Sequence, residues 1–332
     1  MQRLIWSVVL SFLLALALGP IVIKWLRRMK FGQNIYELGP ESHKVKQGTP
    51  TMGGIIFAIP MLVVPVVMSF EASRWSFLPI VLVATAGFGA IGFVDDWIKI
   101  GKKRSLGLTA KQKFVAQILV SAGLAVWAYV NPLIGSKLYV PFTSLQWDLG
   151  WAFIPILAFV MVATVNSSNL LDGVDGLLGG CALLDFATLS MLLLAFSTQV
   201  PYELHGDFMN IMIFSGCAAG ALLGYLRYNS YPASVIMGDV GSFAIGGALV
   251  GVCLVTRMSL VIPIIGLALV VSTVSDLIQF AYFRATHGKR IFKMAPFHHH
   301  LELSGMPETR IVSLYMIVTA LMCLLTLLWV SG

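Results

Sequence analysis

Long apolar stretches dominate the chain, and they limit its possible folds more than any other feature. A membrane-spanning helix needs about 20 mostly apolar residues. Ten stretches approach or exceed this length, near residues 4–24, 52–69, 77–94, 113–130, 151–166, 176–196, 208–225, 241–256, 260–283 and 311–330. The sequence therefore predicts an all-α, polytopic integral membrane protein with about ten transmembrane helices.

The composition excludes the other broad classes of protein. Of the 332 residues, 58% are hydrophobic and 11% are charged, whereas a soluble domain carries about 25% charged residues. A chain with this much apolar surface is not intrinsically disordered either. The four cysteines all fall in apolar runs without metal-ligand spacing, which favours buried free thiols.

The basic residues are divided unequally between the two sides of the predicted bundle. Of the 22 Lys and Arg residues, 18 lie in the connections near 24–50, 95–113, 166–175, 226–240 and 284–310. The positive-inside rule places these connections in the cytoplasm and both chain termini outside it. The same distribution accounts for the net charge of +7 without a nucleic-acid partner. Residues 1–332 are thus expected to form one transmembrane domain, with the loops near 24–50, 95–113, 166–175, 226–240 and 284–310 together on its cytoplasmic face.

Five polar clusters fall on these connections, and each has a plain structural alternative. They are Lys44–Gly54, Phe93–Lys99, Asn166–Gly176, Met237–Ser242 and Ala295–Glu302. Charged groups near a bilayer are costly and usually mark function. A basic loop, a solvated helix end, ordinary turns and a helix N-cap are the alternative interpretations for the first four. Together the clusters offer carboxylates for a metal, cations for phosphate, and Asn and Asp for a nucleoside, which suits phosphoryl transfer to a lipid phosphate.

Two clusters suggest more specific chemistry. Asp95 and Asp96 end the third predicted span, where acidic groups oppose the helix dipole, so a cation or a proton-transfer role is expected there. Asp239 lies between two glycines at a helix start, which suits Mg²⁺. The histidines 298–300 fit phosphate binding or proton transfer better than a zinc site, because no cysteine is near and consecutive residues rarely share one ion.

These motifs, taken in order, resemble those of a known family. The strings are GTPTMGG at 48–54, FVDDW at 93–97, NLLDGVDG at 169–176, MGDVGS at 237–242 and APFHHHLE at 295–302. From about residue 24 to 330 the chain resembles the phospho-N-acetylmuramoyl-pentapeptide transferases, which are the translocase I enzymes of peptidoglycan synthesis. They belong to the polyprenyl-phosphate N-acetylhexosamine-1-phosphate transferase superfamily, and the three histidines resemble the muramoyl-pentapeptide branch.

The resemblance implies a reaction, a cofactor and a location. UDP-MurNAc-pentapeptide and undecaprenyl phosphate would give lipid I and UMP, with Mg²⁺ as cofactor. The family resemblance also implies a homodimer in the lipid bilayer of the bacterial cytoplasmic membrane, with the active site on the cytoplasmic face.

The resemblance also implies roles for individual residues. The matching catalytic residues are Asp95, Asp96, Asp239 and His298, with Asp239 as the Mg²⁺ ligand. The matching substrate-binding residues are Lys46, Thr51, Asn169, Asp172, Asp175, Asn229, Gln279, His299 and His300. Asp95 is expected to act as a base toward the lipid phosphate, or alternatively as a covalent nucleophile or an orienting charge. A lipid phosphate is already mostly ionised near neutral pH, since its second pKa is about 6, so a base would contribute little.

Two intramembrane acids depart from the expected pattern and motivate a different class of function. Asp185 lies ten residues into the sixth span, and Asp276 shares a helix face with Gln279 in the ninth. Asp276 is expected to line the active-site cavity. Intramembrane acids often relay protons, so a proton-coupled transporter is one alternative. The other alternative is a sister enzyme that transfers GlcNAc-1-phosphate.

Overall fold

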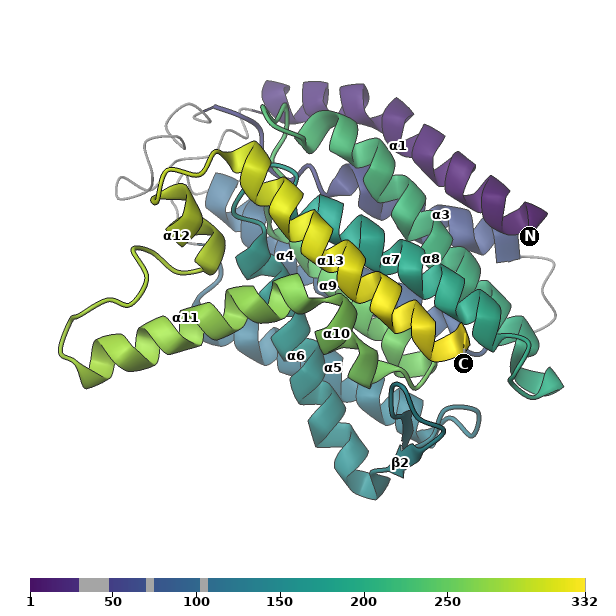
Figure 1. Cartoon of the computed structure of the whole chain (residues 1–332). Helices are drawn as coiled ribbons and strands as arrows, with labels where there is room; N and C mark the ends of the chain where they lie inside the picture. Colours follow the sequence, from purple (N-terminus) through teal and green to yellow (C-terminus); the bar gives the residue numbers. More distant parts are fainter. Residues whose placement is uncertain (30–47, 70–74, 102–106, 332) are drawn as a thin grey trace.

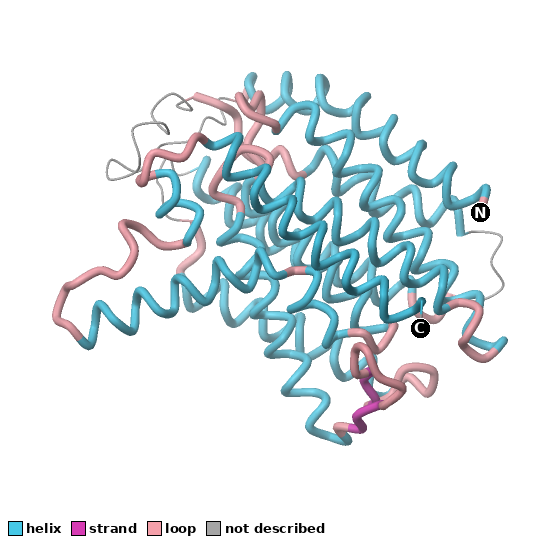
Figure 2. Tube along the Cα trace, in the orientation of Figure 1, coloured by secondary structure: helices cyan, strands magenta, loops and turns pink. Residues whose placement is uncertain are grey.

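The protein is almost entirely helical in the computed structural model, which describes residues 1–29, 48–69, 75–101 and 107–331. The long helices are α1 (Gln2–Arg28), α3 (Ile55–Ser69), α4 (Leu78–Gly101), α5 (Ala110–Val130), α6 (Phe153–Leu171), α7 (Leu177–Phe196), α8 (Tyr202–Asn229), α9 (Gly238–Val255), α11 (Leu267–Ala285) and α13 (Glu308–Ser331). Short helices η1 (Gly150–Ala152), η2 (Ser259–Val261), α10 (Ile262–Ile265) and α12 (Phe297–Glu302) connect them. Strands β1 (Lys137–Tyr139) and β2 (Gln146–Asp148) form an antiparallel hairpin (Figures 1 and 2).

Each predicted span corresponds to one of the long helices. Within the described residues, nine helices are long and apolar enough to cross a membrane, and α3, with 15 residues, is a shorter apolar tenth. The prediction of an all-α polytopic membrane protein is confirmed. The four cysteines are free and buried, as expected.

The prediction of one continuous ninth span at 260–283 is wrong. The chain forms η2 and α10 first, and α11 begins only after Gly266. Pro263 lies in the first turn of α10, and the Gly266 N–H bonds back to the Ile262 carbonyl, which closes the single turn of this helix. As a result α11 leaves the bundle at an angle, with α12 beside it (Figure 1).

Several helices also extend beyond their apolar stretches at one end of the bundle. The third, fifth and seventh predicted spans end at 94, 166 and 225, whereas α4, α6 and α8 continue to Gly101, Leu171 and Asn229. Hydropathy predicts only which residues lie in the apolar part of the membrane. A helix can continue beyond that part, because its backbone hydrogen bonds also form in the polar region. Asp95 and Asp96 therefore lie at a helix end, as predicted, whereas Asn169 lies in the last turn of α6 and not in the predicted loop.

Helix α9 lies at the centre of the molecule and is the least exposed of the long helices. In its most apolar stretch 89% of the residues are buried. It packs mainly on α4 and α6. Gly92 of α4 faces the α9 backbone so closely that a Cβ there would overlap the Asp239 carbonyl group. Small residues permit such close helix contacts within a membrane, and this contact fixes the start of α9 against the end of α4.

Both chain termini lie at the end of the bundle away from Asp239. The start of α1 lies beside the first turns of α8, where Met1, Arg3, Gly206 and Met209 line one cavity. Near the end of α13, the Trp329 ring packs on Phe196, 4.9 Å between centroids. Its Nε1 donates to the Thr143 carbonyl at 3.3 Å. The N and C labels lie on the same side in Figure 1.

A buried carboxylate at that same end predicts a stability effect separate from catalysis. Asp207 of α8 is fully buried, and its Oδ1 accepts from the Ser76 and Phe77 N–H groups at 2.8 and 3.1 Å, just before α4. Asp207→Ala leaves these donors without their acceptor and is expected to lower the unfolding free energy by about 1–3 kcal/mol. Thermal unfolding in detergent measures it, with exposed Glu203→Ala on the same helix as control. Equal melting temperatures for the two variants would contradict the assignment.

Candidate active site

Three carboxylates from two helices meet at the end of the bundle opposite the chain termini. Asp95 and Asp96 occupy the last turns of α4, and Asp239 occupies the first turn of α9. One ligand oxygen from each residue lies within 4.8 Å of the others. Asp95 and Asp96 are buried, with 1% and 3% exposure. We call these three residues the carboxylate cluster.

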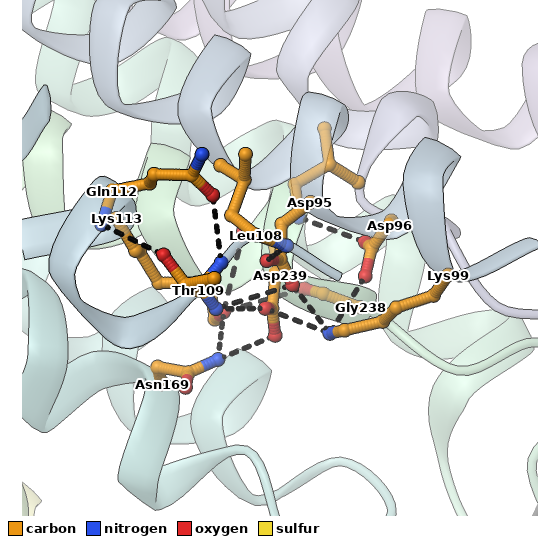
Figure 3. A network of polar contacts seen from close by, with 12 residues as sticks. Asp95, Asp96, Lys99, Leu108, Thr109, Gln112, Lys113, Asn169, Gly238 and Asp239 are labelled. Atoms are coloured by element: carbon orange, nitrogen blue, oxygen red, sulfur yellow. Dashed lines mark hydrogen bonds and ion pairs between the residues drawn. The ribbon is translucent and has the colours of Figure 1, made fainter. Parts of the chain in front are cut away.

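Two lysines bridge the carboxylates (Figure 3). The Lys99 Nζ lies 2.7 Å from Asp95 Oδ2, 3.4 Å from Asp96 Oδ1 and 2.9 Å from Asp239 Oδ2. The Lys113 Nζ, from the first turn of α5, lies 3.1 Å from Asp95 Oδ2 and 2.8 Å from Asp239 Oδ2. The two ammonium groups therefore hold the ends of α4, α5 and α9 together.

Backbone and amide donors fix the remaining carboxylate oxygens. The Leu108 N–H donates to Asp95 Oδ1 at 2.8 Å, and the Val240 N–H donates to Asp96 Oδ2 at 3.1 Å. The Asn169 Nδ2, at the end of α6, donates to Asp239 Oδ1 at 2.8 Å. Four helices thus orient three carboxylates, which makes the cluster rigid.

The donor set fits a divalent metal ion. Within the described residues, three carboxylates face two ammonium groups, so the fully ionised cluster carries a charge of −1. Converging carboxylate oxygens are the ligands that hard divalent cations prefer. A cluster of this charge would repel a diphosphate substrate, whereas an added divalent cation would reverse the sign and attract it.

The loop before α3 reaches the same place. Gly238 adopts a φ of +75°, and a Cβ on it would lie 2.6 Å from Asp96 Oδ2 and 2.9 Å from Thr51 Oγ1. The predicted substrate-binding residue Thr51 is therefore close to the carboxylate cluster. The Gly53 and Gly54 N–H groups bond to the carbonyls just before α9, which fixes this loop. Lys46, also predicted to bind substrate, lies outside the described residues.

The loop after α6 is fastened mainly by polar side chains that were predicted to bind substrate. The Asn229 Oδ1 accepts from the Gly176 N–H at 3.1 Å, and its Nδ2 donates to the Val235 carbonyl at 3.0 Å. The Asp175 Oδ2 accepts from the Ala233 N–H at 3.0 Å. These two side chains join the loop after α6 to the loop before α9. Asp172 is the C-cap residue of α6, and its N–H bonds back to the Asn169 carbonyl.

The three consecutive histidines do not point to one place. His298 and His299 lie against Gly173, where an added Cβ would fall 2.9 Å from His299 Nε2. The His299 Nδ1 lies 3.2 Å from Glu302 Oε2. His300 instead stacks on Phe297, and its Nδ1 accepts from the Lys293 N–H at 3.1 Å. Two histidines therefore face the loop after α6, and the third orders its own loop.

Gln279 and Asp276 of α11 line one cavity. The Gln279 Oε1 accepts from the Ile291 and Phe292 N–H groups at 3.1 and 3.0 Å, so its amide holds the following loop in place. Asp276, Gln279 and Arg290 line a cavity of about 380 Å³ next to this loop. Asp276 thus shares a cavity with the predicted substrate-binding residue Gln279, and its place in the active-site cavity stays a prediction.

Asp185, the other intramembrane acid, is buried between α7 and α13. Its Oδ1 lies 3.8 Å from the Cys323 Sγ, which also contacts the Leu184 carbonyl at 3.7 Å. Asp185 is 3% exposed and contributes nothing to the carboxylate cluster.

Sequence reasoning missed Lys99 and Lys113 as site residues. Both were counted only as basic residues that set the membrane orientation. The spacing held a signal for Lys99, because positions i+3 and i+4 from Asp96 and Asp95 lie on the same helix face. No local signal identified Lys113, since its carboxylate partners come from other helices.

Comparison with known proteins agrees with this geometry. The sequence profile of glycosyl transferase family 4 matches residues 78–257, and the phospho-N-acetylmuramoyl-pentapeptide-transferase signature 1 matches residues 46–57. The chain is 43% identical to the phospho-N-acetylmuramoyl-pentapeptide-transferase of Clostridium novyi over 325 residues, which cover 98% of the chain and 96% of that relative. It is 42% identical to the enzyme of the same name from Bacillus subtilis over 313 residues, which cover 94% of the chain and 93% of that relative. The chain therefore belongs to the phospho-N-acetylmuramoyl-pentapeptide-transferase family.

Proposed function

We propose that the chain transfers phospho-MurNAc-pentapeptide from UDP-MurNAc-pentapeptide to undecaprenyl phosphate. The products are lipid I and UMP, and the reaction is the first membrane step of peptidoglycan synthesis. The observation that carries this proposal is the meeting of three carboxylates and two lysines at one end of a bundle of apolar helices. The whole chain acts as one catalytic domain in the bacterial cytoplasmic membrane, with the carboxylate cluster facing the cytoplasm. The homodimer stays a prediction.

The cofactor in this proposal is Mg²⁺, held by Asp239 together with Asp95 and Asp96. Bound there, Mg²⁺ would supply positive charge to the diphosphate of the nucleotide substrate. Asn169 orients the Asp239 carboxylate through its 2.8 Å hydrogen bond. Lys99 and Lys113 supply two further positive charges, and their rigid helix ends would orient phosphate oxygens.

The proposed roles of the other residues follow from their positions. Asp95, fixed by the Leu108 N–H, acts by holding the Lys99 and Lys113 ammonium groups that orient the attacking phosphate. Because that phosphate is already mostly ionised, a base would contribute little. Thr51, beside the carboxylate cluster, and Asp172, at the end of α6, bind substrate. His298 and His299, next to the loop after α6, bind phosphate or transfer a proton to the leaving nucleotide. Asn229, Asp175, Gln279 and His300 act by holding the loops that carry these groups.

Lys99 should compete with the metal ion, and this gives a prediction that needs no turnover. Lys99→Gln removes one of the two cations that neutralise the carboxylate cluster. The metal-free protein is expected to be less stable and to bind Mg²⁺ at least about tenfold more tightly. The rise in melting temperature with added Mg²⁺ measures this. Lys111→Gln, on the same helix end as Lys113, serves as the control. A rise no larger than that of the wild type would contradict the competition.

The function is tested by UMP release from the purified full-length protein in detergent. The reaction contains UDP-MurNAc-pentapeptide, undecaprenyl phosphate and Mg²⁺, and each component is omitted in turn. Release that requires all three and stops with EDTA is the expected result. UMP release with UDP-GlcNAc as donor, but not with UDP-MurNAc-pentapeptide, would identify the chain as a GlcNAc-1-phosphate transferase of the same superfamily. No release with either donor from folded protein would overturn the transferase and favour a transporter, which needs two compartments.

A further inference from the structure

A second charged hollow lies at the same end of the bundle as the carboxylate cluster, but between different helices. The cavity has a volume of about 610 Å³ and lies between the last turns of α1 and α8. Its polar lining residues are Lys24, Arg27, Arg28, Arg227, Tyr228 and Ser234. We call it the basic pocket. No residue of the carboxylate cluster lines it, and the proposed reaction does not use it.

Packing between the two helices fixes the wall of the basic pocket. The Tyr228 hydroxyl donates to the Leu16 carbonyl of α1 at 2.8 Å. The Tyr228 ring lies on Gly19, where any Cβ would overlap it. The Arg227 guanidinium lies over the same ring, 5.9 Å from its centroid. Arg227 is thereby held beside Lys24, Arg27 and Arg28 of α1, and the four exposed cations share one wall of tightly packed helices.

The basic pocket gathers four positive charges, which favours binding of an anion. Four cationic side chains line it, and no acidic residue does. Within the part of the chain that the structure describes, none of the four forms an ion pair. Cations at the end of a helix interact favourably with its dipole. That effect and the positive-inside rule favour cations at both helix ends, and an anion in the hollow would offset the mutual repulsion of the four.

The apolar surroundings indicate what kind of anion fits. Pro20 and Ile23 line the same pocket, about one turn deeper along α1. Beside them Ile21 and Trp25 are 64% and 40% exposed. A soluble phosphate would make no apolar contact with these side chains, whereas a lipid can place its phosphate among the cations and its acyl chains along α1. Tryptophan is also typical of the membrane–water interface.

We propose that the basic pocket binds the phosphate group of an anionic phospholipid. The occupant is a lipid of the surrounding bilayer and not the lipid substrate of the carboxylate cluster. Basic pockets between transmembrane helices are a general means of recognising anionic lipid headgroups. A lipid bound here holds the end of α1 against the end of α8, from which Asn229 fastens the loop after α6.

The test is quenching of tryptophan fluorescence by brominated lipids in detergent micelles. Brominated phosphatidylglycerol is expected to quench saturably, with at least about tenfold higher apparent affinity than brominated phosphatidylcholine. The saturable component should disappear in Trp25→Phe, which locates the lipid beside the basic pocket. Arg27→Gln/Arg227→Gln is expected to weaken phosphatidylglycerol binding by roughly thirty-fold. The control Lys289→Gln/Arg310→Gln removes two exposed cations elsewhere on the chain and should change binding by less than about twofold.

Three results would overturn the proposal. Equal quenching by the two lipids would show that charge is not recognised. Displacement of phosphatidylglycerol by excess glycerol phosphate would assign the pocket to soluble anions, and displacement by equimolar undecaprenyl phosphate would assign it to the substrate. If the double variant does not fold, the salt dependence of lipid binding to the wild-type protein tests the proposal instead. Raising the salt concentration must weaken binding of phosphatidylglycerol but not of phosphatidylcholine.

Discussion

Asp239→Ala is expected to reduce UMP release by at least about 10³-fold while the protein remains folded. One carboxylate oxygen of Asp239 lies 2.9 and 2.8 Å from the Lys99 and Lys113 ammonium groups, and the other accepts from Asn169. The substitution removes both oxygens and raises the charge of the carboxylate cluster by one unit. Steady-state UMP release at saturating Mg²⁺ measures the loss, and gel filtration in detergent reports folding.

A second substitution separates charge from hydrogen bonding at this position. Asp239→Asn keeps the shape and an acceptor oxygen but loses the charge, and it is expected to be nearly as inactive as Asp239→Ala. The matched control is Asp148→Asn in strand β2, at the far end of the molecule. Asp148 is also ionised, because the Ser136 hydroxyl and the Gly150 N–H lower the pKa of its carboxyl. Activity above a tenth of the wild-type value in Asp239→Asn would refute an electrostatic role.

Gly92→Ala is expected to damage both stability and activity although the residue carries no functional group. A Cβ at Gly92 would overlap the Asp239 carbonyl and lie 2.7 Å from the Val240 nitrogen. Because backbone must move to relieve this overlap, we expect a loss of about 3 kcal/mol in unfolding free energy. The start of α9 must shift away from α4, and a displacement of about 1 Å in a catalytic group lowers turnover about 100-fold.

The control for Gly92→Ala is the same change where space is open. Gly123 lies inside α5, and a Cβ there meets no atom within 4 Å. Gly123→Ala is expected to leave turnover unchanged and to add up to about 1 kcal/mol of stability through helix propensity. Melting temperature and UMP release are measured for both variants. Equal results for the two would mean that the contact between α4 and α9 does not position Asp239.

The spans could be predicted from the sequence because every membrane-spanning helix must be long and mostly apolar. The sequence placed Asp95, Asp96 and Asp239 on one face of the membrane because acids at matching ends of spans lie on the same side, but their approach to within 4.8 Å comes from the packing of α4 on α9. The break at Gly266 was not predicted, because the apolar run continues across it. Lys113 and the close approach at Gly92 depend on which helices are neighbours, and hydropathy carries no information about neighbours.

Several residues that were predicted to bind substrate instead hold loops in place. All motif residues were assigned to catalysis or substrate binding from their resemblance. In the structure, Asn229, Gln279 and His300 direct their polar atoms at backbone groups of adjoining loops. A motif includes every residue that a function needs. Residues that hold a loop in position are therefore part of it, as well as the reactive groups.

The burial of α9 has a consequence for how the enzyme responds to its membrane. Helices that face lipid adjust their tilt when the thickness of the bilayer changes. Helix α9 contacts mainly protein, so its height is set by α4 and α6 and not by the surrounding acyl chains. The carboxylate cluster at its start is therefore insulated from hydrophobic mismatch. Any dependence of turnover on acyl-chain length should then arise from how the lipid substrate reaches the site, not from distortion of the site itself.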